Sequence, residues 1–158
     1  MAEENTSNQA ERQFSIQKIY VKDISFETPN SPQVFTQTWE PQVEFNLASS
    51  AQQIQDGVYE VGLTITLTVK LEQKTAYLVE ITQAGIFNAS GFQNEEMGHL
   101  LGSYCPNLLF PYAREVVSDL VAKGGFPPML LAPVNFDALY AQHLQQMQQG
   151  GGQSVTSH

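Results

Sequence analysis

The sequence predicts an α+β fold, a four-stranded antiparallel sheet followed by two helices packed on one of its faces. Apolar and polar residues alternate in four segments between about residues 14 and 83, which is the pattern of strands that each bury one face. After Asn94 the apolar residues recur at helical spacing instead. A series of strands followed by helices is the order of elements in an α+β domain.

The clearest strand pattern is YEVGLTITLTVKL, residues 59–71, in which apolar residues alternate with glutamate, glycine, threonine and lysine. It predicts a long strand with one apolar and one polar face. QVEFNL (42–47) and TAYLVEITQ (75–83) alternate in the same way on either side of it. The link at residues 72–74 suits a hairpin. SSAQQIQDG (49–57) is a longer link, in which Asp56 and Gly57 are the turn signal.

The first predicted strand, at about residues 14–26, reaches the next strand only through ETPNSPQVFTQTWEP (27–41). This segment contains Pro29, Pro32 and Pro41, so it cannot be a central strand. We therefore expect a long ordered crossover loop, and it carries the aromatic residues Phe35 and Trp39. Loops of this length in a compact domain are usually functional.

The helical region begins with Asn94 as the expected cap and ends at Gly124 and Gly125, with interruptions at Pro106 and Pro111. It predicts one kinked helix or two pieces. GFPPMLLAPV (125–134) cannot form a regular helix, and Asn135 is expected to cap a last helix. The apolar side of that helix carries Phe136, Leu139, Tyr140, His143, Leu144 and Met147.

The chain is expected to form one domain, residues 13–149, between mobile polar tails at 1–12 and 150–158. Strict alternation would place Ile19 and Val21 on the same face as Asp23. The helices also carry more apolar positions than one four-stranded sheet needs. We therefore expect part of the apolar surface to be buried against other copies of the chain.

The charge balance restricts the partners. Seven basic residues against 16 acidic ones give a formal net charge of −9, which disfavours nucleic acid and favours basic protein segments. We expect no membrane insertion, because the chain has no apolar run of about 18 residues. It begins with no secretory signal pattern, and its single Cys105 allows no internal disulfide. These features predict a cytoplasmic protein.

The sequence offers little that could support catalysis. Asp23 and Glu27 share a face of a strand but would lie about 13 Å apart, beyond the separation of about 5 to 9.5 Å that glycosidases use. Their simplest interpretation is a solvated face. Cys105 with His99 or His143 leaves a small oligomeric hydrolase open, although its apolar neighbours indicate a packed thiol. We predict no catalytic residue, no metal site and no cofactor.

Several longer motifs occur in a characteristic order: IYVKDISFETPN (19–30), VYEVGLTITLTV (58–69), ITQAGIF (81–87), YCPNLLFPYARE (104–115) and LAPVNFDALY (131–140). In these motifs the chain closely resembles the SecB family of bacterial protein-export chaperones, from about residue 14 to about residue 149. The resemblance implies the predicted sheet, crossover loop and two helices. It also implies a homotetramer built as a dimer of dimers.

Function and site residues also follow from this resemblance. Members of the family hold newly made preproteins unfolded without ATP and deliver them to SecA, the motor of the Sec translocase. The positions that match the SecA-binding residues are Asp23, Glu27, Leu78 and Glu80. The positions expected to line a client-binding groove are Phe26, Phe35, Trp39, Phe136, Tyr140 and Leu144. A SecB-like chaperone dedicated to one partner, such as an antitoxin, is the alternative.

Overall fold

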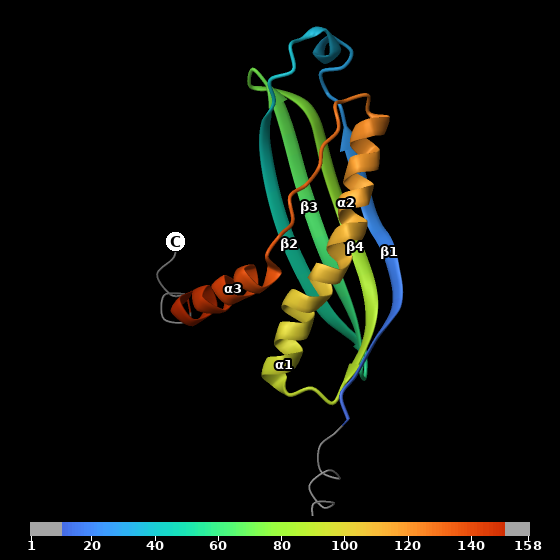
Figure 1. Ribbon diagram of the computed structural model, residues 1–158, viewed down its shortest axis with the longest axis vertical. Coiled ribbons are helices and arrows are strands. Elements are labelled where there is room, and N and C mark those ends of the chain that lie inside the picture. The colour runs from blue at the N-terminus through green and yellow to red at the C-terminus, as the bar shows by residue number, and fades with distance from the viewer. Residues whose placement is uncertain (1–10, 151–158) are drawn as a thin grey trace, which may run out of the picture.

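The computed structural model describes residues 11–150, which form one antiparallel sheet of strand order β1–β4–β3–β2 with helices on one side (Figure 1). The strands are β1 (Gln13–Glu27), β2 (Gln42–Gln55), β3 (Val58–Leu71) and β4 (Lys74–Ser90). Because β1 and β2 are consecutive in sequence but occupy opposite edges, the chain between them crosses the end of the sheet. It contains a 3₁₀ turn, η1 (Gln33–Thr36). The predicted fold class and crossover loop are confirmed.

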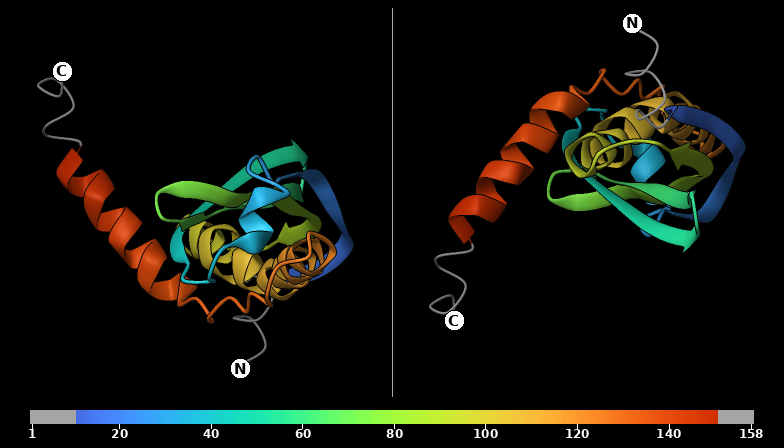
Figure 2. Two further views of the ribbon diagram at one scale, coloured as in Figure 1. Left: turned by 90° about the horizontal axis from the view of Figure 1, so that it is seen from above. Right: turned by 90° about the horizontal axis from the view of Figure 1, so that it is seen from below.

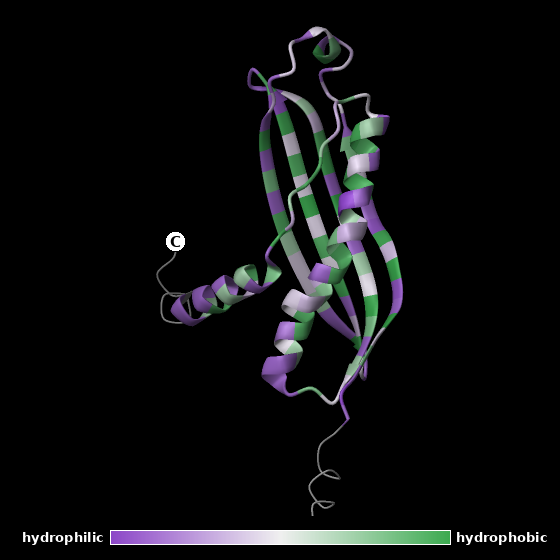
Figure 3. Ribbon diagram, viewed as in Figure 1, coloured by the Kyte–Doolittle hydropathy of each residue, from purple (hydrophilic) through white to green (hydrophobic). Residues whose placement is uncertain are grey.

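The core lies between helix α2 (Cys105–Lys123) and the face of the sheet that it covers, which we call the inner face. Along β3 and β4 the apolar residues of this face, from Val61 to Leu71 and from Tyr77 to Ala89, are at most 2% exposed. Figure 3 shows the alternation of hydrophobic and hydrophilic residues that produces this face. The residues of α2 that are fully buried lie four positions apart: Cys105, Leu109, Ala113, Val117 and Val121. Burying one large aliphatic side chain contributes about 1.5–3 kcal/mol.

The helical region is one continuous run, made of α1 (Asn94–His99), a π-helical segment (Leu100–Tyr104) and α2. The Cys105 N–H donates to the Leu100 carbonyl, five residues earlier, just before Pro106, which has no N–H to donate. The interruption predicted at Pro106 is thus a change from α-helical to π-helical hydrogen bonding just before it, and the helix does not break there. The N-cap is Gln93, which forms a reciprocal capping box with Glu96, so the predicted cap at Asn94 was wrong by one residue.

Two irregularities in β1 change which residues face the core. Register shifts at Gln17 and Lys22 each insert one extra residue relative to β4. Between the two bulges, Ile19 lies opposite Gly85 and Val21 opposite Gln83, which are inner-face positions. The expectation that Ile19 and Val21 share the face of Asp23 was therefore wrong, because each bulge reverses the alternation.

The expected long link at residues 49–57 is mostly strand. β2 continues to Gln55 and pairs with β3 as far as Val58, so that only Asp56 and Gly57 form the turn. Gly57 has a φ of 74°, as this turn requires. The polar residues of the segment hid its strand character, since both faces of this end of an edge strand meet solvent.

The C-terminal part leaves the body of the domain. α2 ends at Lys123 with Gly124 as its C-cap, and Gly125, with a φ of 84°, closes a Schellman motif in which the Phe126 N–H donates to the Val121 carbonyl. Asn135 caps α3 (Phe136–Gly150) as predicted, its side-chain oxygen accepting from the Ala138 N–H at 3.0 Å. Figure 2 shows α3 extending beyond the β2 edge of the sheet.

The residues outside the described range include most of the two predicted tails, 1–12 and 150–158. Within residues 11–150, none of the helices combines the length and apolar character needed to cross a membrane.

We predict that Gly85→Ala destabilises the domain by about 1–3 kcal/mol. A methyl group at this inner-face position would lie 2.8 Å from the Phe87 ring and 3.1 Å from Leu109, where α2 approaches the sheet. Urea unfolding measures the effect. Gly62→Ala is the matched control, since its added methyl would meet the mobile Ser50 hydroxyl at 3.1 Å on the other face. Equal losses from both variants would contradict the prediction.

Candidate functional site

The outer face of the sheet, opposite α2, carries the predicted SecA-binding residues on its two adjacent strands β1 and β4. Glu27 lies opposite Leu78, and Asp23 lies opposite Thr82, two residues along from Glu80. Residues directly opposite each other in a ladder share a face, so Asp23, Glu27, Leu78 and Glu80 form one surface, which we call the acidic patch. The three carboxylates are exposed, and Leu78 is half-buried among them. Their role stays a prediction.

Two lysines of the sheet are engaged by acids outside this patch. Lys22 Nζ lies 2.9 Å from a Glu60 carboxylate oxygen, and Lys70 Nζ lies 3.2 Å from Glu44. Glu60 also accepts hydrogen bonds from the Tyr20 hydroxyl and, at 3.0 Å, from the Gln52 amide. The Glu60 carboxylate of β3 therefore links β1 to β2 through hydrogen bonds and forms an ion pair with Lys22.

This arrangement shifts the pKa of both main partners. The hydrogen bond from Tyr20, and next that from Lys22, hold the pKa of Glu60 below its usual value. The same bond to Glu60 raises the pKa of Tyr20 to about 12, because a phenolate beside a carboxylate is unfavourable. Sequence periodicity places Glu60 on the polar face but gives no sign of these partners.

The predicted client-binding residues fall into two separate groups. The first is an aromatic cluster beneath the crossover loop, where Phe35 and Trp39 lie 5.1 and 5.8 Å from the Phe126 ring, centroid to centroid. Phe126 in turn packs against Tyr77 at 4.7 Å, and Tyr77 stacks on Phe26. Half of the Phe35 surface is exposed, so the cluster is accessible from outside.

The second group lines a groove between α3 and the inner side of β2. This α3 groove has a volume of about 830 Å³, and its floor is formed by the helical residues Gly98, Leu101 and Gly102. β2 contributes residues 47–51 to one wall. The predicted residues Phe136, Tyr140 and Leu144 lie on the α3 wall. Leu139, Leu144 and Met147 are exposed there, which leaves apolar surface open to a partner.

Sequence reasoning missed two members of the aromatic cluster. Phe126 follows the glycines that end α2, where a hydrophobic residue commonly packs back on the helix, so its sequence position was a usable signal. Tyr77 belongs to the alternating segment 75–83, whose pattern indicates a strand face and gives no sign of an aromatic cluster. Its hydroxyl is buried, and burial raises its pKa to about 12.

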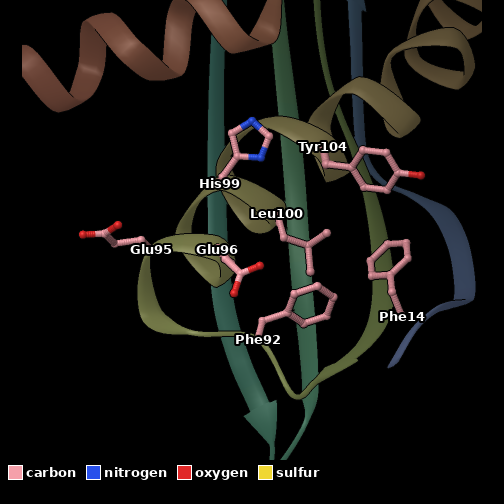
Figure 4. Close-up of a pocket in the computed structure, with 7 residues that line it drawn as sticks. All are labelled: Phe14, Phe92, Glu95, Glu96, His99, Leu100 and Tyr104. Atoms are coloured by element: carbon pink, nitrogen blue, oxygen red, sulfur yellow. The ribbon is translucent and has the colours of Figure 1, made fainter. Parts of the chain in front are cut away.

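A third hollow, of about 590 Å³, lies at the α1 end of the domain (Figure 4). Phe14, Phe92 and Leu100 form its apolar lining with Tyr104, while Glu95 points away from them. Phe14 packs edge-on against Tyr104 at 5.4 Å. The sequence did not indicate this site.

The thiol of Cys105 is unsuited to nucleophilic catalysis. It is fully buried, and that burial raises its pKa to about 12, so the thiolate is not formed near neutral pH. His99 interacts with Asp137 at 2.8 Å instead of with the thiol. Among residues 11–150 no three His, Cys, Asp or Glu residues gather as metal ligands.

A small α+β domain with open apolar grooves along its inner side and an acidic patch on its outer face has the surfaces of a polypeptide-binding protein of the chaperone class. Comparison with known proteins identifies the family. The family model SecB, described as preprotein translocase subunit SecB, matches residues 7–147. The chain therefore belongs to the SecB family, and it is a chaperone for protein export.

Individual relatives agree with this assignment. The chain is 71% identical over 158 residues to the protein-export protein SecB of Methylococcus capsulatus, with 100% of both chains covered. It is 58% identical to the protein-export protein SecB of Nitrosococcus oceani, covering 98% of this chain and 99% of the relative.

One solved structure shows a similar fold. It is the SecB-like chaperone Rv1957 of Mycobacterium tuberculosis, in complex with a ChAD peptide from the HigA1 antitoxin. The TM-score is 0.64 at 15% identity, covering 77% of this chain and 90% of that one.

We predict that Glu60→Gln makes the stability of the domain less dependent on pH in the acidic range. The lowered pKa of Glu60 means that its ionised form stabilises the folded state above the unfolded pKa of 4.5, and that this contribution is lost as pH falls below it. Urea unfolding at pH 7, 5, 4 and 3 should show a smaller loss in Glu60→Gln than in the wild type. Identical slopes would contradict the role of the Tyr20 and Lys22 hydrogen bonds.

Proposed function

We propose that the protein is an ATP-independent holdase, which keeps preproteins unfolded on its apolar grooves and delivers them to the SecA motor through its acidic patch. It acts in the cytoplasm by binding alone, with no catalytic step of its own. The observation that carries the proposal is the placement of these two surfaces on opposite faces of one sheet. A client and a motor could then bind at the same time without competing for contacts.

The client side is supported by the kind of surface that the grooves offer. The exposed residues there, such as Phe35, Leu144 and Met147, are apolar and differ in shape. Such a surface can accept many sequences, because apolar contact is not directional. Two separate groups of contacts along one domain would also let an extended segment bind at both, which raises its overall affinity.

The motor side is supported by charge. A single exposed ion pair is worth only about 0–1 kcal/mol, so Asp23, Glu27 and Glu80 must act together to bind a basic segment. Leu78 provides an apolar contact in their midst. Electrostatic attraction of this kind speeds association and weakens as the salt concentration rises.

Assembly as a homotetramer, a dimer of dimers, is part of the proposal. At the β1 edge the inner-face residues Ile16, Val21 and Ile24 are exposed in the single chain, as are Tyr104 and Tyr112 on the helical run. Apolar surface at an unpaired sheet edge favours pairing with a second copy. Four copies would also repeat each acidic patch and each groove.

We expect the triple change Asp23→Lys, Glu27→Lys, Glu80→Lys to weaken SecA binding by roughly 100-fold or more, because attraction becomes repulsion at three neighbouring positions. Isothermal titration calorimetry with purified SecA measures the affinity. Binding of an unfolded preprotein should remain within about twofold of the wild type.

The matched control reverses three exposed acids elsewhere, Glu11, Glu40 and Glu95. It changes the net charge of the chain equally and should keep most of the SecA affinity. Equal loss in both variants would show that overall charge, rather than the acidic patch, governs the interaction.

We expect Phe35→Ala and Leu144→Asp each to weaken client binding by roughly fivefold or more, while SecA binding persists. The first removes an exposed anchor of the aromatic cluster, and the second places a charge in the apolar α3 groove. Fluorescence titration with several unrelated unfolded preproteins measures the effect. Binding of a single one among them would favour a dedicated chaperone and contradict the general role.

A further inference from the structure

Helix α3 is buried only near its beginning. Phe136 is 6% exposed and packs edge-on against the Phe110 ring at 5.9 Å, and Tyr140 is half-buried. Every residue from 141 to 149 is exposed. At about 1.5 Å of rise per residue, Met147 lies about 10 Å along the axis from Tyr140. The direction of the whole helix is therefore set by its first turn and a half.

The first part of α3 packs against two glycines of the helical run. Gly98 and Gly102 are one turn apart on the helical run, and the Tyr140 ring lies over both. A Cβ atom at Gly102 would come within 2.7 Å of the ring carbons Cδ2 and Cε2, and one at Gly98 within 2.7 Å of the Tyr140 hydroxyl oxygen. No side chain larger than hydrogen fits beneath the ring without moving it.

Polar contacts hold the same turn from the other side. Ser103 Oγ donates to Asp137 Oδ1 at 2.5 Å, and His99 Nε2 lies 2.8 Å from the same oxygen. These contacts, the Ser103 bond first, hold the pKa of Asp137 below its usual value. The His99 ring also meets the Tyr140 ring edge-on at 5.8 Å. Residues of one helical run thus contact all three residues that anchor α3, which are Phe136, Asp137 and Tyr140.

We propose that Gly98 and Gly102 are positioning residues that set the distance of α3 from the groove floor, and with it the size of the apolar side chain that the α3 groove accepts. Both glycines form part of the floor of that groove. A methyl group at either position would push Tyr140 outward and widen the groove, and the exposed end of α3 would move furthest. This inference rests on the proposed client-binding role of the groove.

The geometric test needs no client. Spin labels at Gln53 on β2 and Gln148 on α3 report the opening of the groove by pulsed electron resonance, with labelled chains diluted into unlabelled ones. Cys105 can remain, because it is buried. The mean distance should lengthen in Gly102→Ala. Alanine has a higher helix propensity than glycine, so the substitution does not weaken the helix itself. A longer distance would therefore report displacement of α3 rather than unfolding.

A second substitution, Tyr140→Phe, distinguishes the effects of the two glycine variants on the label distance. At Gly98 only the hydroxyl oxygen is too close, since the ring carbon Cζ lies at an ordinary 3.9 Å. Tyr140→Phe should therefore restore the wild-type distance in Gly98→Ala. It should not do so in Gly102→Ala, where the clashing ring carbons remain. Unchanged distances in both single variants, or equal rescue of both, would overturn the inference.

The selectivity test uses unfolded peptides that differ at one position, with Leu or Trp. The preference between them should shift toward Trp by roughly tenfold in Gly102→Ala, about the effect of one methylene in an apolar pocket. A longer distance with an unchanged preference would overturn the link to client size. Failure of the wild type to bind either peptide would instead overturn the proposed client role, while the label distances would still test the glycines.

Discussion

The structure depends on the packing of one helix along the middle of one sheet. α2 lies on β3 and β4, and its buried row from Cys105 to Val121 approaches so closely that a Cβ atom at Gly85 would lie 3.1 Å from Leu109, besides 2.8 Å from Phe87 of its own strand. Four strands span about 19 Å at about 4.8 Å each, whereas a helix with its side chains is about 10–12 Å wide. One helix therefore cannot cover the inner face. The edges of that face, on β1 and β2, keep apolar residues such as Ile24 and Phe45 exposed, and in the proposed function these margins bind other polypeptides.

The outer face follows from the same arrangement. With the core supplied by one side of the sheet, the other side is free to carry threonines, amides and charges. Glu60 shows that this side is ordered as well as wet, since it joins three strands and engages Lys22. Lys22 is thus paired with Glu60, and no cation of the described residues forms an ion pair with Asp23, Glu27 or Glu80. A face that only had to remain solvated would not need the hydrogen bonds and the ion pair that Glu60 makes.

Much of this could be predicted from the residues. The alternation of β3 and β4, the caps at Gly125 and Asn135 and the crossover loop are local patterns with local causes, and the structure confirms them. The bulges of β1 could not be predicted, because a bulge has no residue pattern of its own. Each one nevertheless changes the face of the sheet to which the following side chains point. The residues expected to line one client-binding groove lie in two separate groups, and this separation could not be predicted, since their members come from the loop, the sheet and α3 and meet only in three dimensions. For the same reason no sequence pattern indicated the hydrogen-bond partners of Glu60 or the contact of Tyr140 with Gly98 and Gly102.

The contrast between the two helical parts explains why α3 is the element suited to adjustment. α2 is held along its whole length by buried side chains, so displacing it would expose much of the core. The anchoring contacts of α3 come from Phe136, Asp137 and Tyr140 in its first turn and a half, whereas its residues 141–149 are all exposed. Tilting it costs a few contacts near one end, yet it moves a wall of the groove over about 10 Å of length. If the α3 groove binds clients as proposed, such a wall can adjust to side chains of different sizes, because the helix keeps its own backbone hydrogen bonds while its attachment at one end yields.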